Sequence, residues 1–534
     1  MRTREPLENA QLHLMIRNPP NNKGGIWGQT WYSVISQSDG SFTFEGVQPG
    51  EYTLRGEKAG YLLTSYGSRT GMTEGITLAL QPGQQLAGIQ MHLIQQATIT
   101  GRVLHEGGDP VPNALVQAIT FVHMSGLSRY LPRGQAMTDE AGTYRIDGLP
   151  PGAYYIVTQL QRPTMGIQER PTIPGKPNLQ PMPTYYPSSL DRAGAIAIQV
   201  KTGQEIPGVD IRQRTLPAFH VRGKLTGQSN NEDKTQTIVT LQPADGSVLF
   251  LGPGMTVVRS DHTFDIANVA PGSYTLSVPG FTGKKETASQ PVEVGSADVN
   301  DVIVTVHPAF AIHGLVELQG SLPGIAKEKA LENVRVIMIP DDLSLYLPDG
   351  GSTSKADGTF MLENVPPLKM KVHVDSEPEG AYVKSIRFGK QDAMGKTLDL
   401  TEASGGDLRI VLRAGEAQVS GTVVKKRERN AVDDSAAMIL LIPEDLTRNG
   451  GSVHSTNTNQ NGAFTEKGMA PGVYYAVAFE SEDFRGWDDP TVLKQLVDRG
   501  TKVEVQENDK KQVQVTMLSA EDLQAALTAA GIAN

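Results

Sequence analysis

Short runs of alternating apolar and polar residues, bounded by glycine and proline, recur along the whole chain. The stretch DGSFTFEGVQPGEYTL at 39–54 shows the pattern. A turn leads to Phe42 and Phe44, which share one side of a strand, and a second turn leads to a strand that returns from Tyr52. A period of two is typical of strands with one buried face. The pattern predicts an all-β protein rich in hairpins.

This stretch has five copies, which begin near residues 39, 140, 261, 357 and 461. A period of about 100 residues is too long for a solenoid repeat and fits one small β-sandwich per copy. We therefore predict a tandem array of five immunoglobulin-like or transthyretin-like β-sandwich domains with a short C-terminal helix. Units one to five are predicted at 1–96, 97–215, 216–308, 309–414 and 415–534.

Four of the five copies contain Pro-Gly and a corner tyrosine, whereas the fourth copy has Leu368 in place of the glycine and Met370 in place of the tyrosine. Asp-Gly or Asn-Gly predicts a two-residue hairpin turn in which both residues have positive φ, and Pro-Gly predicts a type II turn. The tyrosine two residues later is expected to donate its hydroxyl to a backbone group at the corner. The residues that define the repeat are Asp39, Gly40, Pro49, Gly50, Tyr52, Pro151, Gly152, Tyr154, Pro271, Gly272, Tyr274, Pro471, Gly472 and Tyr474.

Unit one lacks the element that opens the other four units. Those open with TITGRVL, HVRGKL, AIHGLVEL or QVSGTVV, whereas PLENAQLHLMI at 6–16 matches ALENVRVIMI at 330–339, a second strand. A sandwich without its first strand exposes an unpaired edge. We expect Met1 to be an internal methionine of a longer chain, whose earlier part holds that strand and an export signal.

The C-terminus changes from strand to helix. Asp489 as a cap, Pro490 at the first helical position and Gly500 after the last one predict a helix. Ser519 followed by Asp522 resembles a capping box and predicts a second helix. Because the apolar residues of the second segment are small, we expect it to pack lightly or fray.

Composition and charge exclude several classes of protein. The net charge of −10 with scattered basic residues does not suit nucleic-acid binding. The longest apolar runs, such as AAMILLIP at 436–443, fall short of the ~20 residues of a membrane span. The absence of cysteine removes disulfides, thiolate nucleophiles and cysteine-ligated zinc.

Units one and two resemble a known family. GRVL, PVPNALVQA and TDEAGTYRIDGLPPGAYYI in unit two are similar to the carboxypeptidase regulatory-like domain, a transthyretin-like sandwich related to collagen-adhesin B-type repeats and grouped with carbohydrate-binding-like folds. AGYLLTSYGSRT and PTYYPSSLDRAGAIAIQV resemble large exported bacterial proteins built from tandem copies. The resemblance implies export to the outer membrane, periplasm or exterior, and no peptidase activity.

Motifs of catalysis or metal binding do not occur in the sequence. None of the ten histidines has a glutamate three residues later, as a zinc carboxypeptidase would require. We find no nucleophile elbow, phosphate-binding loop or dinucleotide fingerprint. We therefore expect no enzyme, no cofactor and no metal site.

Aromatic residues are the best candidates for ligand contacts. Trp27 and Trp31 have the same strand parity and would lie ~13 Å apart on one face, a spacing that suits stacking on sugar rings. They could equally cover the core of unit one. The candidate ligand-binding residues are Trp27, Trp31, Tyr32, Tyr185, Tyr186 and Trp487.

Three functions follow in order of preference. The first is a non-catalytic scaffold of the bacterial envelope or exterior that binds or adheres. Its partner would be a polysaccharide or another envelope protein, and carbohydrate is the ligand class that the resemblance implies. The second is a structural stalk or spacer that presents an upstream domain. The third is an enzyme whose site is assembled between units.

Overall fold

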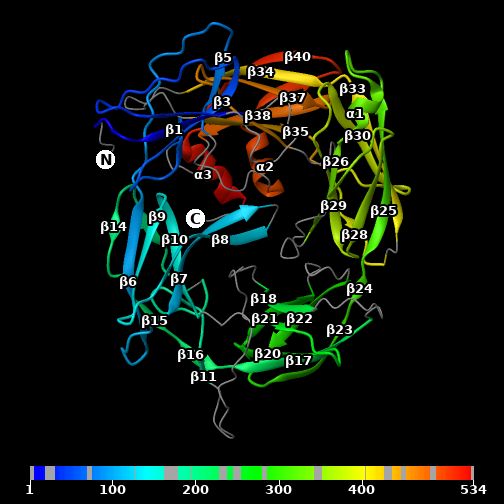
Figure 1. Cartoon of the computed structure of the whole chain (residues 1–534). Helices are drawn as coiled ribbons and strands as arrows, with labels where there is room; N and C mark the ends of the chain where they lie inside the picture. Colours follow the sequence, from blue (N-terminus) through cyan, green and yellow to red (C-terminus); the bar gives the residue numbers. More distant parts are fainter. Residues whose placement is uncertain are drawn as a thin grey trace.

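The structure, a computed structural model, is almost entirely β and confirms the predicted fold class. It describes residues 5–17, 31–68, 75–124, 127–160, 179–192, 194–227, 237–244, 254–278, 286–341, 351–402, 405–425, 436–446, 453–480 and 489–530. Within that part of the chain, no helix is long and apolar enough to cross a membrane. In Figure 1 the five units follow one another around a circuit, and unit one lies beside unit five.

Unit one has a single sheet in the order β2-β1-β3-β4, with β5 also paired to β3. Its strand β1 leads directly into the hairpin with β2, as the second strands of the other units do. Leu12, Leu14 and Leu54 form the centre of its core. The strands are β1 (Gln11–Ile16), β2 (Trp31–Ile35), β3 (Gly50–Glu57), β4 (Thr64–Ser65) and β5 (Thr77–Leu80).

Unit two has two main sheets, one around β6 and the other around β7 and β10. Its core residues Ile99, Val116 and Ile156 are fully buried. The strands are β6 (Ala97–His105), β7 (Ala114–Met124), β8 (Leu127–Met137), β9 (Thr143–Leu149), β10 (Gly152–Leu160), β11 (Leu179–Pro181), β12 (Thr184–Tyr185), β13 (Ile198–Val200), β14 (Glu205–Ile206) and β15 (Ile211–Gln213).

Unit three repeats the two-sheet plan, with sheets β20-β17-β23 and β19-β18-β21-β22-β24. Strand β16 (Thr215–Pro217) precedes it and pairs back to β11. The strands are β17 (Phe219–Thr226), β18 (Ile238–Pro243), β19 (Gly254–Val257), β20 (Thr263–Val269), β21 (Gly272–Val278), β22 (Glu286–Val294), β23 (Val299–Thr305) and β24 (His307–Pro308).

Unit four has the sheets β28-β25-β33-β30-β31 and β27-β26-β29-β32, and a short helix covers one end of its core. The helix is α1 (Lys327–Leu331). The strands are β25 (Phe310–Gln319), β26 (Arg335–Pro340), β27 (Gly351–Thr353), β28 (Thr359–Val365), β29 (Lys369–Asp375), β30 (Ala381–Phe388), β31 (Gln391–Asp392), β32 (Leu398–Asp399) and β33 (Gly406–Ala414).

Unit five has the sheets β37-β34-β40 and β36-β35-β38-β39, and two helices pack on the outer face of the second sheet. The strands are β34 (Ala417–Val424), β35 (Ala437–Pro443), β36 (His454–Asn457), β37 (Ala463–Met469), β38 (Gly472–Glu480), β39 (Thr501–Val505) and β40 (Lys510–Thr516). The helices are α2 (Pro490–Val497) and α3 (Ala520–Ala529).

The C-terminal helices correct one expectation. Asp489 caps α2, and Ser519 with Asp522 forms the capping box of α3, so both predicted helix starts are confirmed. The second helix does not fray, because Leu523 and Leu527 are buried against α2 and strands β35 and β38. The sequence does not reveal this contact. The apolar run of β35 predicts a strand that is buried on both faces, but it does not indicate which element covers the outer face.

The hairpin turns also differ from the prediction. In the first hairpin turn Gly40 has a positive φ of 77°, but Asp39 does not. This turn is therefore a three-residue loop instead of a two-residue one. The amide of Gln37 donates to Ser41 O, and the carboxylate of Asp39 accepts from the Ser41 amide at 2.9 Å. This side-chain contact satisfies the loop backbone and makes a second positive φ unnecessary.

The corner turns are not type II. Gly50, Gly152 and Gly272 have φ of 158°, and each is the first residue of the returning strand. The tyrosine two residues later closes the corner instead. The hydroxyls donate to the carbonyl four residues before: Tyr52 to Gln48 at 2.7 Å, Tyr154 to Pro150 at 2.6 Å, Tyr274 to Ala270 at 3.0 Å and Tyr474 to Ala470 at 2.8 Å.

Units one and five are in direct contact. Thr77 and Asn459 form a parallel bridge, and the amide of Gln460 donates to Ala79 O at 3.0 Å and accepts from Ala79 N at 3.1 Å. Ala436 of unit five belongs to the core cluster of unit one. The last unit therefore supports the first, although they lie at opposite ends of the sequence.

Candidate functional site

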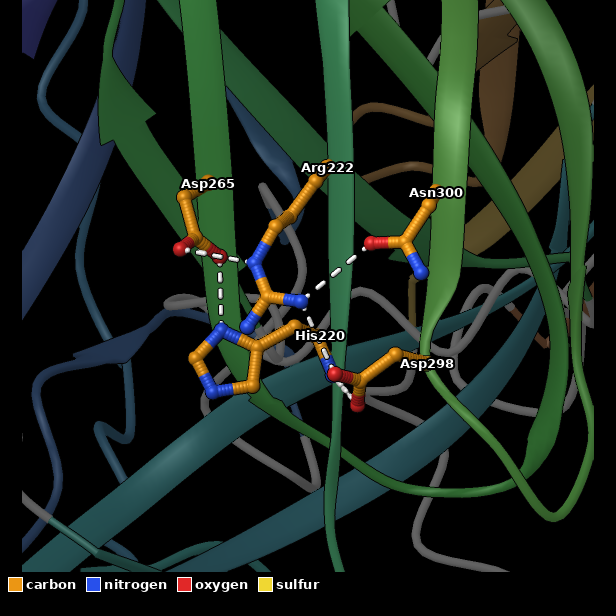
Figure 2. Close-up of polar contacts among 5 residues, drawn as sticks. All are labelled: His220, Arg222, Asp265, Asp298 and Asn300. Atoms are coloured by element: carbon orange, nitrogen blue, oxygen red, sulfur yellow. Dashed lines mark hydrogen bonds and ion pairs between the residues drawn. The ribbon is translucent and has the colours of Figure 1, made fainter. Parts of the chain in front are cut away.

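The most concentrated polar cluster among the described residues lies on one sheet of unit three. Figure 2 shows His220 and Arg222 of β17 between Asp265 of β20 and Asp298, which directly precedes β23. Strand β17 is the central strand of its sheet, so its outward side chains reach both neighbours. Strand alternation thus brings together residues that are up to 78 positions apart.

Arg222 joins the three strands of this cluster. Its Nε donates to Asp265 Oδ2 at 3.1 Å, and its Nη1 donates to Asp298 Oδ2 at 2.8 Å and to Asn300 Oδ1 at 3.2 Å. Burial acts against the charge on Arg222, but these hydrogen bonds prevail and raise its pKa. The guanidinium is therefore a permanent cation that holds β20 and β23 against β17.

His220 supplies a second set of contacts. Its ring Nδ1 lies 2.7 Å from Asp265 Oδ1, and its backbone amide donates to Asp298 Oδ1 at 3.0 Å. Burial acts to raise the pKa of Asp298, but the His220 amide and the Arg222 guanidinium outweigh it and hold that pKa below its usual value. A histidine oriented by an aspartate also occurs in active sites, where the histidine acts as the base that activates a nucleophile. In the described part of the chain, the hydrogen bonds of His220 go to the carboxylates of Asp265 and Asp298.

Unit two has a related cluster in which the arginine occupies a different strand. Arg145 occupies the place of Asp265, because each follows the first buried aromatic residue of its strand. Arg145 pairs with Glu205 at 2.7 Å and with Asp147 at 3.0 Å. Glu205 is opposite Thr98 of β6, and Asp298 occupies the equivalent place beside β17. In unit two, however, Asp147 lies on the same strand as Arg145, so the ion pairs join only β9 and β14, and the arginine reaches β6 through the Thr98 hydroxyl at 3.4 Å.

The recurrence of an arginine–carboxylate group at the same sheet position in two units favours strand pairing as its role. Opposite charges that face each other on neighbouring strands stabilise a sheet. Sequence reasoning missed the cluster because its members are spread over β17, β20 and β23. The detectable signal is the charged residue that directly follows the first aromatic residue of the hairpin strand in units two and three, Arg145 after Tyr144 and Asp265 after Phe264.

The structure removes Tyr185 from the candidates for ligand stacking. Its ring is 5% exposed and packs against Ile119 and Val157, so it belongs to the core instead of the surface. Tyr186 is half-buried and packs against the main core of unit two. Tyr185 and Tyr186 therefore anchor the segment after β11 to the core. The sequence could not show this, because either ring could have faced outward.

The remaining aromatic candidates divide between the corner of unit one and undescribed parts of the chain. Tyr32 is half-buried, its ring meets Tyr52 edge-on at 6.2 Å, and its hydroxyl accepts from the Gln48 amide. Trp31 begins β2, opposite Met15, but its side chain is outside the described part. Trp27 and Trp487 also lie outside the described residues. Stacking by Trp27 and Trp31 stays a prediction.

Within the described residues, no group of three or more histidines and carboxylates is arranged to hold a metal ion. The cluster around β17 is not such a metal-binding group, because Arg222 lies at its centre and forms ion pairs with both carboxylates.

Comparison with known proteins locates one recognisable domain. Residues 98–174 match the carboxypeptidase regulatory-like domain, which confirms the resemblance for unit two. A curated relative is the protocatechuate 3,4-dioxygenase beta chain of Burkholderia cepacia, which is 39% identical over 72 residues. The match covers 11% of this chain and 31% of the dioxygenase chain, so it spans about a third of that protein.

Solved structures with similarity to this chain are bacterial proteins built from β-domains. The Bacillus anthracis TIE protein is 12% identical, with 81% of this chain and 75% of that chain covered and a TM-score of 0.14. Two B repeat units of the collagen binding protein of Staphylococcus aureus are 11% identical (79% and 99% covered, TM-score 0.14). A streptococcal ancillary pilin is 11% identical (56% and 98% covered, TM-score 0.18). Similarity at this level carries no inference about partners.

Proposed function

We propose that this chain is a non-catalytic scaffold of the bacterial envelope or exterior that works by binding. The observation that carries the proposal is the arginine–carboxylate group that recurs at the same sheet position in units two and three, where ionisable groups join strands. The most catalysis-like group of side chains in the described part thus has a structural role. The domain boundaries at 96, 215, 308 and 414 belong to the same proposal, since β6, β17, β25 and β34 begin close after them.

Carbohydrate is the ligand class that we propose for this scaffold. The support is the resemblance of unit two to carbohydrate-binding-like folds and the strand parity of Trp27 and Trp31. Tyr185 no longer contributes, because its ring is buried. Aromatic rings bind sugars by offering a flat apolar face, so the proposal requires at least one exposed tryptophan ring in unit one.

A glycan array with the intact chain tests the ligand class. We expect one group of related polysaccharides to bind, and Trp27→Ala or Trp31→Ala to weaken that binding about tenfold or more. Trp487→Ala, in unit five, is the matched control and should leave binding unchanged if the site is in unit one. Circular dichroism and thermal unfolding establish that each variant is folded. A folded chain that binds no glycan would end the carbohydrate proposal.

The linear spacer is the less favoured function. A spacer separates its two ends, whereas units one and five here share the bridge between Thr77 and Asn459 and the contacts of Gln460. Small-angle scattering distinguishes the two arrangements. A maximum dimension that matches the circuit in Figure 1 supports the scaffold, and an extended profile of five units in a row supports the spacer.

A further inference from the structure

The outer face of the sheet in unit one has a groove beside the linker to unit two. It lies where β1 begins and β3 ends, and its volume is about 360 Å³. Sites for small ligands typically have volumes of ~300–1,000 Å³, so the groove is large enough for one. Its lining includes Asn9, Gln11, Glu57, Lys58, Tyr61 and Leu63.

A row of four exposed residues crosses this face, and we call it the outer row. Gln11 of β1 is opposite Ile35 of β2 on one side and opposite Glu57 of β3 on the other. Leu63 directly precedes β4, and the register of β4 with β3 continues to place it beside Glu57. Ile35 and Leu63 are 60% and 50% exposed. The outer row therefore has apolar ends and a polar centre, and strands ~4.8 Å apart give it a length of ~14 Å.

The wall of the groove at Tyr61 is fixed by the linker between units one and two. Tyr61 and Gln95 form an antiparallel bridge, and the amide of Leu62 donates to Ile94 O at 2.8 Å. The amide of Tyr61 also donates to Lys58 O at 3.0 Å, which closes the turn before it. Because the backbone of this wall is already ordered, a ligand would lose little free energy in ordering it.

The polar groups of the groove differ in charge and in hydrogen-bonding type. Glu57 Oε1 lies 3.7 Å from His13 Nε2, and His13 Nδ1 lies 2.8 Å from Ser33 Oγ, so the carboxylate is positioned from one side. Lys58 Nζ donates to Glu8 O at 2.5 Å. The exposed side-chain amides of the lining can both donate and accept. One anion and one cation balance each other, so the groove has little net attraction for a charged ligand.

The equivalent place has a different character in units four and five. Asn9 and Asn333 both directly precede their strands with positive φ, so Arg335 occupies the place of Gln11. Arg335 is opposite Asp375 of β29, and the pair is charged throughout. In unit five, α2 and α3 cover the outer face of the corresponding sheet. Of these three units, unit one combines an amide with exposed apolar residues on both sides.

We propose that this groove is a subsite for a neutral, hydroxyl-rich sugar chain. Sugar hydroxyls both donate and accept, and the side-chain amides and the carboxylate of the lining supply partners of both kinds. The apolar face of a sugar ring can pack on Tyr61 and Leu63. The inference rests on the proposed carbohydrate-binding function and names a place on the chain where that ligand binds.

Calorimetric titration of the intact chain tests the subsite. The probes are maltohexaose, cellohexaose and chitohexaose, which are neutral, and hexagalacturonate, which is charged. We expect a neutral probe to bind, and Gln11→Ala and Glu57→Gln each to weaken it about tenfold, because each removes a hydrogen-bonding group or its charge. Leu63→Ala should weaken it about threefold through lost apolar contact.

The matched control makes the same chemical change in unit four. Asp375→Asn, like Glu57→Gln, turns an exposed carboxylate into an amide on the outer face of its sheet, and it should leave the affinity unchanged. Both positions are exposed, so thermal unfolding should change little in either variant. Raising the salt concentration from about 0.05 to about 0.5 M should change the affinity for the neutral probe less than about twofold.

Three results would overturn the subsite. Unchanged affinity in Gln11→Ala and Glu57→Gln would place the sugar elsewhere on the chain and leave the proposed function intact. Binding of hexagalacturonate alone would contradict the neutral ligand class. Binding of none of the probes by the folded chain would remove the subsite, whereas a glycan array without any bound glycan would in addition end the proposed function.

Discussion

Unit one and unit four share the second-strand pattern and the hairpin strand, but their cores are very different, and unit four has Leu368 and Met370 where unit one has Gly50 and Tyr52. Among the described residues, the buried cluster of unit four has 24 members drawn from two sheets. That of unit one has eight, one of which, Ala436, comes from unit five. The second strands match closely, since Asn9 and Asn333 both have positive φ, at 57° and 71°, directly before β1 and β26. The difference shows that the repeated sequence specifies which segments form strands. The burial of their side chains depends on what packs against the sheet.

The hydroxyl contacts before these strands strengthen the comparison. Ser36 Oγ donates to Leu7 O and accepts from Ala10 N, and Ser354 Oγ makes the same pair of contacts with Leu331 O and Val334 N. The described sheet of unit one is therefore built like its counterpart in unit four. Within the described residues, unit four adds a second sheet in which β25 is an interior strand.

The largest predicted effect comes from truncating the aromatic residue of the hairpin strand. Phe360→Ala should lower the free energy of unfolding of unit four by about 3–5 kcal/mol, because the ring is buried and leaves a cavity. Phe42→Ala should cost unit one only about 1–2 kcal/mol, because its ring is half-exposed. Hydrogen exchange of amides in β28 and β3 measures each unit separately. Equal losses would break the comparison.

The second prediction concerns the corner tyrosines. Tyr474→Phe should destabilise unit five by about 1–3 kcal/mol, because it leaves the buried carbonyl of Ala470 without this donor. Tyr52→Phe should cost about 1 kcal/mol or less, since its hydrogen bond to Gln48 is only part-buried and water can replace the hydroxyl. The measurement is local hydrogen exchange in β38 and β3. A larger loss in unit one would show that its corner is closed to water.

The smallest predicted effect is the pH dependence of the sheet β20-β17-β23 of unit three. The pKa of Asp298 is lower in the folded state than its usual value, so ionised Asp298 stabilises unit three at neutral pH. This contribution is lost as the pH falls through the lowered pKa, and the partly exposed site limits it to about 1 kcal/mol. Exchange in β17 and β23 should rise in acid more than exchange in β1, and Arg222→Gln should remove most of the difference. An unchanged profile in that variant would contradict the assignment.

Most of the strand plan could be predicted from the sequence, because alternation and turn residues are local. The periodic Tyr52, Tyr154, Tyr274 and Tyr474, the second-strand start of unit one and both helix caps needed only neighbouring residues. The turn types were wrong, because the Asp39 side chain and the Tyr52 hydroxyl satisfy the turn backbone in ways that composition does not reveal. The candidate site was harder still, since Tyr185 gives no sign in the sequence of which way its ring faces.

The sequence by itself determined the all-β class and the five copies of one unit. Each of these follows from the period of apolar residues, which every segment carries locally. Only the tertiary structure decided that α3 packs on β38, that unit five touches unit one, and that one arginine joins three strands in unit three. These contacts join residues far apart in the chain, and their free energy depends on distances that no local pattern encodes.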